Sequence, residues 1–361
     1  MVEPERMYVL IMAGGRGMRF WPLSRESRPK QLLPITGEGP MIRMTVDRVL
    51  PLVPAEQILV ITGEAHRAEV QSLLPELPAA NIIPEPVGRN TAACIGLGAE
   101  IILNRRPEGI MVVLPADHAI ARPDAFRRLV AAGAAAALRQ EALVTLGIRP
   151  TRPETGYGYL EAAQSGQEIE GHPVLPVLRF HEKPAPDLAR RYLAGGRHYW
   201  NSGIFIWQAR VIRRWIERLL PDLSRRLDCL SPACGRPEFG LLLAEHYPAL
   251  ESVSIDHGVL EKAEGVVMIP ADMGWEDVGS WSAAGRFWPQ EEKSAVMGQV
   301  LPLDSTGCVV YSPDKVVALI GVNDMVIVDT PDVLLICPKH LDQDVRKLVE
   351  KLREQGRLDL L

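Results

Sequence analysis

Short apolar runs alternate with longer amphipathic stretches over the first half of the chain. Four apolar runs predict buried strands, at residues 8–12, 58–61, 110–114 and 142–146. Apolar positions at helical spacing predict helices between them, at residues 41–50, 91–104 and 125–139. Strands that alternate with helices are typical of βαβ units. We therefore expect an α/β, Rossmann-like domain with a mixed, mostly parallel sheet and helices on both faces.

After residue 155 the regular alternation of strand-like and helical stretches changes. Strand-like runs lie at residues 157–161, 176–182, 202–207 and 266–270, with helical segments across 209–248. We assign all of this to one domain over residues 1–288, and a polar stretch at 290–294 predicts a linker.

The remaining residues, 289–361, predict a small β unit with a closing helix. Short strands separated by turn residues are expected at residues 308–311, 316–320, 325–328 and 333–336, and an amphipathic helix at 339–355. A small β unit must bury its apolar faces somewhere, so we expect it to form the contact of a homodimer.

Composition narrows the class of partner. The 361 residues carry a formal net charge of −5, which gives no reason to expect binding to nucleic acid or membranes. No apolar run approaches the roughly 18 residues of a membrane span, and the charged N-terminus does not resemble a signal peptide. The five cysteines are odd in number and scattered, which favours a reducing, cytoplasmic location.

The first apolar run opens into a glycine-rich loop, MAGGRGMRFWPLS (12–24), followed by RPKQ (28–31). Three residues without side chains let backbone N–H groups approach an anion: Gly14, Gly15 and Gly17. Three cations surround the same loop: Arg16, Arg19 and Lys30. A strand, a glycine loop and fixed positive charge are typical of phosphate binding in α/β proteins.

Two common phosphate motifs do not match this loop. A P-loop needs Gly-Lys-Ser/Thr after the glycines, and a dinucleotide fingerprint needs a glycine where Phe20 stands. The loop resembles instead the signature of the sugar-phosphate nucleotidylyltransferase family. Seven further blocks continue the likeness in family order: EPVGRNT (85–91), LPADH (114–118), TGYGY (155–159), FHEKP (180–184), WNSGIF (200–205), SID (254–256) and DVGSW (277–281). The main departures from the family pattern are Met18, Phe20 and Gly88.

The likeness is strongest to the guanylyltransferase branch that uses mannose 1-phosphate. It implies an enzyme that makes GDP-mannose and pyrophosphate from GTP and α-D-mannose 1-phosphate. It also implies a glycosyltransferase-A-like fold for the large domain and a short left-handed β-helix in the C-terminal unit. Two alternatives stay open: a sister pyrophosphorylase using another hexose 1-phosphate or NTP, and a catalytically silent GDP-mannose-binding regulator. A phosphomannose isomerase module would need about 100 further residues or more with a His/Glu zinc cluster, so we expect none.

The resemblance implies that Asp117 and Asp277 hold the Mg²⁺ that arrives with the triphosphate, since Mg²⁺ prefers carboxylate and phosphate oxygens. Taken alone, each aspartate is equally typical of a turn or a helix cap. Glu276 is a weaker candidate, because the motif places the aspartate before Val-Gly-Ser-Trp. A phosphate monoester is largely dianionic at neutral pH, so no general base is needed, and the eight histidines are dispersed without Ser/His/Asp-like spacing.

The resemblance also implies the groups that bind the substrates. Arg19, Lys30 and Lys183 are the expected catalytic cations, the last on the sugar phosphate. The expected substrate-binding set is Gly158, Glu182, Lys183, Asn201 and Asp277, and within it Gly158, Glu182 and Asn201 line the hexose pocket. Taken alone, Lys183 is more typical of a solvated strand end, and Asn201 also suits a turn before Ser202 and Gly203.

Nucleotide binding is expected from the loop and from the block at 85–91. The nucleotide set is Ala13, Gly14, Gly15, Arg16, Gly17, Met18, Arg19, Lys30, Glu85, Gly88, Arg89, Asn90, Thr91 and Asp117. Glu85 offers an acceptor for the guanine N–H groups, while Asn90 suits a helix N-cap as well as a base contact.

Overall fold

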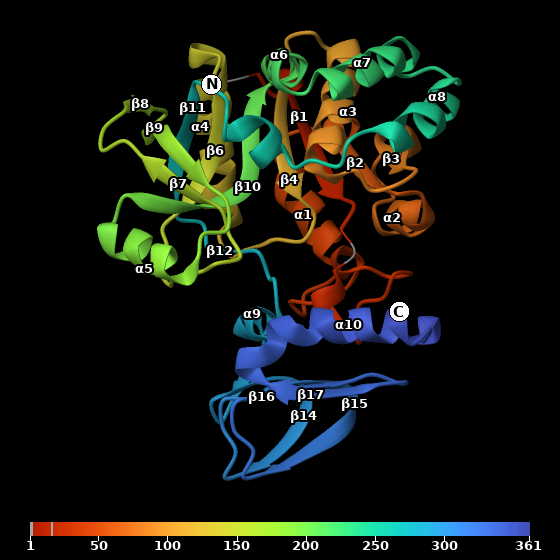
Figure 1. Ribbon diagram of the computed structural model, residues 1–361, viewed down its shortest axis with the longest axis vertical. Helices are drawn as coiled ribbons and strands as arrows, with labels where there is room; N and C mark the ends of the chain where they lie inside the picture. The colour runs from red at the N-terminus through yellow and green to blue at the C-terminus, as the bar shows by residue number, and fades with distance from the viewer. Residues whose placement is uncertain (1–2, 16) are drawn as a thin grey trace. The chain divides into compact units, whose positions relative to one another are not determined.

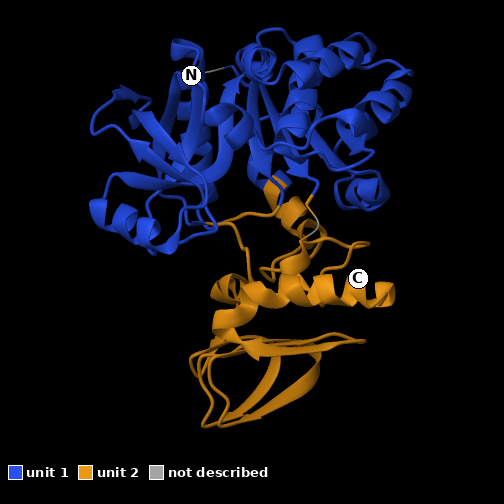
Figure 2. Ribbon diagram, in the orientation of Figure 1, with its two compact units in different colours: residues 1–14, 46–116, 120–275 blue, residues 15–45, 117–119, 276–361 orange. Residues whose placement is uncertain are grey.

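The computed structural model describes residues 3–15 and 17–361 and divides into two units that alternate along the chain (Figure 1 and Figure 2). Unit 1 comprises Met1–Gly14, Val46–Ala116 and Ile120–Trp275, and unit 2 comprises Gly15–Thr45, Asp117–Ala119 and Glu276–Leu361. Arg16, which we expect to bind nucleotide, lies outside the described residues. No helix in the described ranges has the length and apolar character of a membrane span.

The bounds of the elements agree with most of the predicted runs. The strands are β1 (Met7–Ala13), β2 (Ile58–Gly63), β3 (Ile82–Glu85), β4 (Ile110–Pro115), β5 (Ala119–Ile120), β6 (Leu143–Ile148), β7 (Tyr159–Ala162), β8 (Gln167–Ile169), β9 (His172–His181), β10 (His198–Gln208), β11 (Val266–Ala271), β12 (Trp275–Glu276), β13 (Gln290–Glu291), β14 (Ser294–Leu303), β15 (Val309–Ile320), β16 (Met325–Asp329) and β17 (Leu334–Pro338). The helices are α1 (Met41–Val49), α2 (Arg67–Leu73), α3 (Asn90–Arg105), α4 (Pro123–Gln140), α5 (Pro186–Gly195), α6 (Ala209–Leu219), α7 (Pro221–Leu230), α8 (Phe239–His246), α9 (Trp281–Ala284) and α10 (Val345–Glu354).

The large sheet of unit 1 is mixed, with strand order β3-β2-β1-β4-β10-β6-β11-β9-β7. Strands β3, β2, β1 and β4 run parallel, as the βαβ pattern predicts. Strand β10 is antiparallel to both of its neighbours, β4 and β6, and β9 is antiparallel to β11 and β7. The sheet is therefore mixed, as expected, and the expectation that it is mostly parallel is not confirmed. An apolar run encodes burial, whereas its direction depends on how the chain returns to the sheet.

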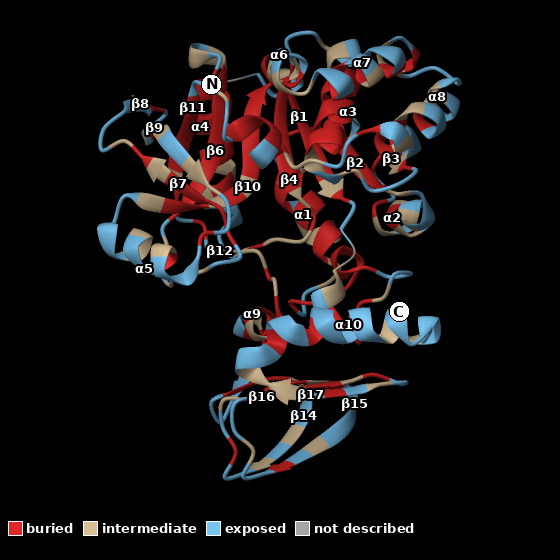
Figure 3. Cartoon of the chain, in the orientation of Figure 1, coloured by how far each residue is buried: buried red, intermediate tan, exposed pale blue. Residues whose placement is uncertain are grey.

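Helices cover both faces of this sheet, as expected (Figure 1). Successive residues of a strand point to opposite faces. On β10, Phe205 and Trp207 belong to the same apolar cluster as the buried residues of α3, α6 and α7. The intervening Ile206 lies against Gly133 of α4 on the other face. Figure 3 shows the central strands β1, β4 and β6 buried, whereas β8 and β9 are partly exposed.

Unit 2 contains a five-stranded sheet in the order β13-β14-β15-β16-β17. Strands β14, β15 and β16 are parallel and enclose a small core of buried residues: Cys308, Val310, Leu319 and Ile327. The two runs predicted at 308–311 and 316–320 form one strand, β15, with a register irregularity where it passes Gly298. The predicted linker is a hairpin, because Glu291 of β13 pairs with Ser294 of β14. The handedness of the β-helix stays a prediction.

A second core joins the glycine loop segment of unit 2 to its C-terminal helix. Phe20, Trp281, Trp288 and Val345 belong to one buried apolar cluster. The first part of the predicted closing helix is a 3₁₀ segment, Lys339–Asp344, and α10 follows it. This core therefore holds the loop after β1 beside α10 within unit 2.

Candidate active site

Lys30 connects the two predicted metal ligands. It begins a short 3₁₀ turn, Lys30–Leu32, and is almost fully buried, at 4% exposure. Its Nζ donates to Oδ2 of Asp117 at 2.9 Å and to the backbone oxygen of Asp277 at 2.8 Å. The structure thus brings together three predicted residues that lie far apart in the sequence.

The charge of Asp117 is maintained by this contact. Burial by itself would raise the pKa of Asp117, but the ammonium of Lys30 outweighs it and holds the pKa below its ordinary value. Asp117 is therefore ionised at neutral pH. An ionised carboxylate next to a fixed ammonium is suited to a centre that handles phosphate charge.

The turn that carries Asp277 is held in an uncommon backbone conformation. Oδ1 of Asp277 accepts the N–H of Gly279 at 3.0 Å, and the intervening Val278 is fully buried with φ of +50°. A positive φ is rare for a β-branched residue, and such conformations cluster at functional sites. An added Cβ at Gly279 would lie 2.9 Å from Asp277 Oδ2 and 3.2 Å from a guanidinium nitrogen of Arg19.

Gly17 is the glycine of the loop whose role the structure explains most directly. Its φ is +60°, and an added Cβ would lie 2.5 Å from Cβ of Lys30 and 2.8 Å from the Lys30 nitrogen. Its carbonyl accepts the hydroxyl of Ser24 at 2.7 Å, and Gln31 Nε2 donates to the carbonyl of Gly15 at 3.1 Å. The absence of a side chain therefore allows the loop to pack directly on the backbone of Lys30.

The glycine-rich loop and Lys30 line a pocket of about 320 Å³ within unit 2. Its lining residues are Gly15, Gly17, Met18, Arg19, Phe20, Lys30, Asp117, Val278, Gly279 and Arg346. Arg19 also donates to Gln343 at 3.2 Å. Sequence reasoning missed Arg346, which belongs to α10. Its only sequence signal is a position on the charged face of the predicted closing helix.

In unit 1 a second group forms around Asn201 of β10. Its Nδ2 donates to Oδ1 of Asp256 at 2.8 Å, and its Oδ1 accepts the hydroxyl of Thr145 at 3.0 Å. Burial raises the pKa of Asp256 to about 7, and the negative charge of Glu182 acts in the same direction. Sequence reasoning noted the block that contains Asp256 but gave this residue no role.

Glu182 and Lys183 follow β9 and form an ion pair at 3.0 Å. Lys183 is exposed and has φ of +44°, so its backbone is also held in the left-handed region. An added Cβ at Gly158 would lie 2.8 Å from Oε2 of Glu182, and the carbonyl of Gly158 accepts the backbone N–H of Asn201 at 2.8 Å. The predicted hexose residues of unit 1 are therefore neighbours.

Glu85, at the end of β3, is buried and accepts the hydroxyl of Tyr247 at 2.8 Å. Burial raises the pKa of Glu85, and the hydrogen bond from Tyr247 opposes this rise. Its other oxygen lies 2.2 Å from the position of an added Cβ at Gly14, so a side chain there would displace the carboxylate of Glu85. Ala13 precedes this glycine at the buried end of β1. Sequence reasoning missed Tyr247.

The other predicted base-site residues lie where β3 leads into α3. Arg89 donates to the carbonyl of Pro248, and the hydroxyl of Thr91 accepts the N–H of Ile255 at 2.8 Å. Asn90 is the first residue of α3, with φ of +63°, and its Oδ1 accepts the N–H of Thr91 at 2.8 Å. Arg89 and Thr91 thus have hydrogen-bond partners within the protein, and the side chain of Asn90 bonds to the first turn of α3. Gly88, which precedes them, is exposed.

Comparison with known proteins agrees with this arrangement. Residues 8–293 match the family model described as nucleotidyl transferase, and residues 298–352 match the one described as MannoseP isomerase/GMP-like beta-helix domain. The chain is 38% identical to mannose-1-phosphate guanylyltransferase 2 of Escherichia coli O157:H7, over 98% of this chain and 74% of that protein. It is also 38% identical to the xanthan biosynthesis protein XanB of Xanthomonas campestris pv. campestris, over 96% of this chain and 73% of that protein.

A solved structure gives the same result. The crystal structure named mannose-1-phosphate geranyltransferase from Thermus thermophilus is 35% identical, with a TM-score of 0.86, over 96% of this chain and 99% of that chain. The chain belongs to the nucleotidyl transferase family, and it is an enzyme of that class. The relatives of this chain include mannose-1-phosphate guanylyltransferases, so the family resemblance found in the sequence is confirmed.

Proposed function

We propose that this enzyme transfers a guanylyl group from GTP to α-D-mannose 1-phosphate. The observation that carries the proposal is Lys30, a buried ammonium bonded to Asp117 and to the backbone of Asp277 in a pocket beside the glycine loop. The relatives named mannose-1-phosphate guanylyltransferase support the choice of substrates.

The reaction needs alignment of charge more than acid–base catalysis. An oxygen of the sugar phosphate attacks the α-phosphorus of GTP, the new P–O bond forms GDP-mannose, and the α–β bridging P–O bond breaks to release pyrophosphate. The attacking phosphate is already largely dianionic at neutral pH, so no proton has to be removed. The enzyme must hold two anions in line and neutralise the leaving group.

Residues of unit 2 serve the triphosphate in this proposal. Glycine-loop N–H groups of Gly15 and Gly17 and the cations Arg19 and Lys30 hold the phosphates, with Arg346 as a further cation in the same pocket. Asp117 and Asp277 offer carboxylate oxygens alone, a donor set that fits Mg²⁺. When bound, Mg²⁺ would supply positive charge to the phosphate oxygens and the leaving pyrophosphate.

Residues of unit 1 serve the sugar phosphate and the base. Lys183 holds the sugar phosphate, and Gly158, Glu182 and Asn201 contact the hexose hydroxyls, with Asp256 fixing the amide of Asn201. The carboxylate of Glu85 accepts from guanine. The other members of the proposed nucleotide-binding set are Ala13, Gly14, Arg16, Met18, Gly88, Arg89, Asn90 and Thr91.

Release of pyrophosphate tests the proposal. The purified chain is incubated with Mg²⁺, each of the common nucleoside triphosphates and either mannose 1-phosphate or glucose 1-phosphate. The proposal predicts the fastest release with GTP and mannose 1-phosphate. A faster reaction with another pair would make the protein a sister pyrophosphorylase. GDP-mannose binding without any release would make it a regulator.

We further propose that residues 1–288 form the catalytic domain and that 289–361 contribute a homodimer contact. The strands of that segment expose six large apolar side chains: Leu301, Leu303, Val316, Ile320, Leu334 and Ile336. Leu303 and Ile320 lie side by side in the register of β14 and β15. Light scattering on Ile320→Glu should give a monomer if this face forms the contact. The cytoplasmic location stays a prediction, consistent with five free cysteines.

A further inference from the structure

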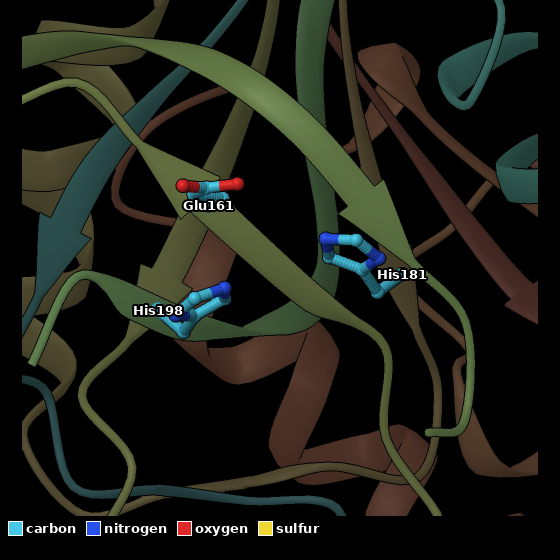
Figure 4. A group of neighbouring side chains, drawn as sticks. All are labelled: Glu161, His181 and His198. Carbon is cyan, nitrogen blue, oxygen red and sulfur yellow. The ribbon is translucent and has the colours of Figure 1, made fainter. Parts of the chain in front are cut away.

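Three strands of unit 1 bring one glutamate and two histidines together on a single sheet face (Figure 4). Glu161 of β7 lies directly opposite His198 of β10 in the strand register. His181, the last residue of β9, lies opposite Tyr159, two residues before Glu161. Because alternate residues of a strand share a face, all three side chains project to the same side.

The three side chains converge closely enough to share one ion. Each offers one ligand atom, a carboxylate oxygen or a ring nitrogen, and these atoms all lie within 4.8 Å of one another. Figure 4 shows Glu161, His181 and His198 arranged around a common centre, each contributed by a different strand. None of them belongs to the residues proposed above for nucleotidyl transfer.

His198 gives an independent indication that a ligand is missing from this cluster. Both of its ring nitrogens are buried, and neither has a hydrogen-bond partner in the described part of the chain. A buried polar group without a partner is unfavourable, and native proteins rarely leave one. A stacking contact fixes the ring plane, since Tyr192 of α5 lies nearly parallel to it with centroids 3.9 Å apart.

We propose that Glu161, His181 and His198 form a binding site for a divalent transition-metal ion such as Zn²⁺. Two imidazoles and one carboxylate are a donor set typical of Zn²⁺ and related ions, whereas Mg²⁺ prefers oxygen ligands alone. Three protein ligands leave a fourth position for water or an external ligand.

The electrostatic surroundings are compatible with a metal ion. Burial lowers the pKa of both His181 and His198, so both rings are neutral, as metal ligands must be, at neutral pH. The negative charges of Glu161 and Glu261 oppose this effect of burial, whereas Arg179 and Arg197 act in the same direction as burial.

An ion at this site would fasten β7, β9 and β10 to one another. Gly158 directly precedes β7, Glu182 directly follows β9, and Asn201 lies within β10, so the ion would act as a clamp on the part of the sheet that carries them. This consequence can be observed as stability and does not depend on the identity of the enzyme's substrates.

The test is zinc binding by the full-length protein after chelation and removal of the chelator. Zn²⁺ is titrated against a chromophoric competitor, and Co²⁺ is used as a spectroscopic probe of nitrogen and oxygen ligation. The proposal predicts one tightly bound equivalent, a zinc-dependent rise in melting temperature, and loss of both in His198→Ala and in Glu161→Gln. Glu161→Gln is the milder variant, because it keeps the size of the side chain.

The control is His257→Ala, which removes an exposed histidine paired with Glu261 at 2.9 Å outside the cluster. It should bind zinc as the wild type does, and so should Asp117→Asn. Absence of zinc binding by the wild type, or equal binding by wild type and both cluster variants, would overturn the proposal. The three side chains would then be a packed group around Tyr192 with no metal function.

Discussion

The pKa of a carboxyl is shifted in opposite directions in the group around Lys30 in unit 2 and in the group around Asn201 in unit 1. The ammonium of Lys30 donates to the carboxylate of Asp117 and to the backbone oxygen of Asp277, and its charge lowers the pKa of Asp117 despite burial. Around Asn201 the carboxyl of Asp256 is bonded to a neutral amide, and burial raises its pKa to about 7. The first group keeps fixed charges at neutral pH, whereas the second can gain or lose a proton there.

This difference fits the two chemical tasks that we propose. Binding a triphosphate requires permanent positive charge and ionised metal ligands. Recognising sugar hydroxyls requires neutral donors and acceptors in fixed positions, and a carboxyl that titrates near neutrality makes that recognition sensitive to pH. The predictions below test each side of the comparison in turn.

Replacing Lys30 should have the largest effect. Lys30→Met removes an ammonium that bonds to both Asp117 and Asp277. We expect kcat/KM for GTP to fall by about 10²–10³-fold, measured as pyrophosphate release. Lys347→Met, at an exposed position of α10, is the matched control. Activity within a few-fold of the wild type would show that Lys30 is merely structural, and melting curves establish that the variant is folded.

Removing Lys183 should affect one substrate more than the other. Its ammonium is exposed and pairs with Glu182. Lys183→Ala should raise KM for the sugar phosphate by about 10–100-fold, the loss expected for one charged hydrogen bond, and change KM for GTP much less. Lys315→Ala in β15 serves as the control lysine. Equal changes for both substrates would contradict the assignment of Lys183 to the sugar phosphate.

Arg346 tests the contribution of the C-terminal helix to the pocket of unit 2. Because it is a peripheral cation that also pairs with Glu350, Arg346→Ala should raise KM for GTP by only about 3–10-fold. The neighbouring Lys347→Ala should leave KM unchanged. If both variants behave alike, Arg346 makes no specific contact with the triphosphate.

The smallest effect concerns the pH dependence of stability. The pKa of Asp256 rises from 3.8 in the unfolded chain to about 7 in the folded protein. Its stabilising contribution is therefore complete below pH 4 or so and is lost as pH rises through about 7. Relative to Asp256→Asn, the wild type should lose on the order of 2–4 °C in Tm between pH 5 and pH 8. Asp272→Asn, a change at an exposed position, is the control and should show the same dependence of Tm on pH as the wild type. If Tm changes with pH equally in all three proteins, the pKa of Asp256 is not raised.

Much of the fold could be predicted from local patterns. The apolar runs of β1, β2, β4 and β6 can be recognised as strands from the sequence because each is short, continuous and bounded by polar residues. The antiparallel direction of β10 could not be predicted, because it depends on the excursion through β7 and β9 that precedes it.

Some residues of the candidate site could likewise be predicted from the sequence, and others could not. Lys30, Asp117 and Asp277 could be selected from the sequence because each sits in a distinctive motif, and in the structure two hydrogen bonds bring them together. Arg346 and Asp256 have no local signature, since their roles arise only when distant segments pack together. The histidines at 181 and 198 are dispersed in the sequence for the same reason and become neighbours only across paired strands.

The most direct test of the central claim is the turnover of Asp117→Asn and Asp277→Asn over a range of Mg²⁺ concentrations. Each change keeps the shape of the side chain and removes one ionised oxygen ligand. If these carboxylates hold the ion that serves the triphosphate, kcat should fall by about 10²-fold or more with the fold retained, and more Mg²⁺ should be needed for half-maximal rate. Wild-type turnover and Mg²⁺ dependence in both variants would contradict the account.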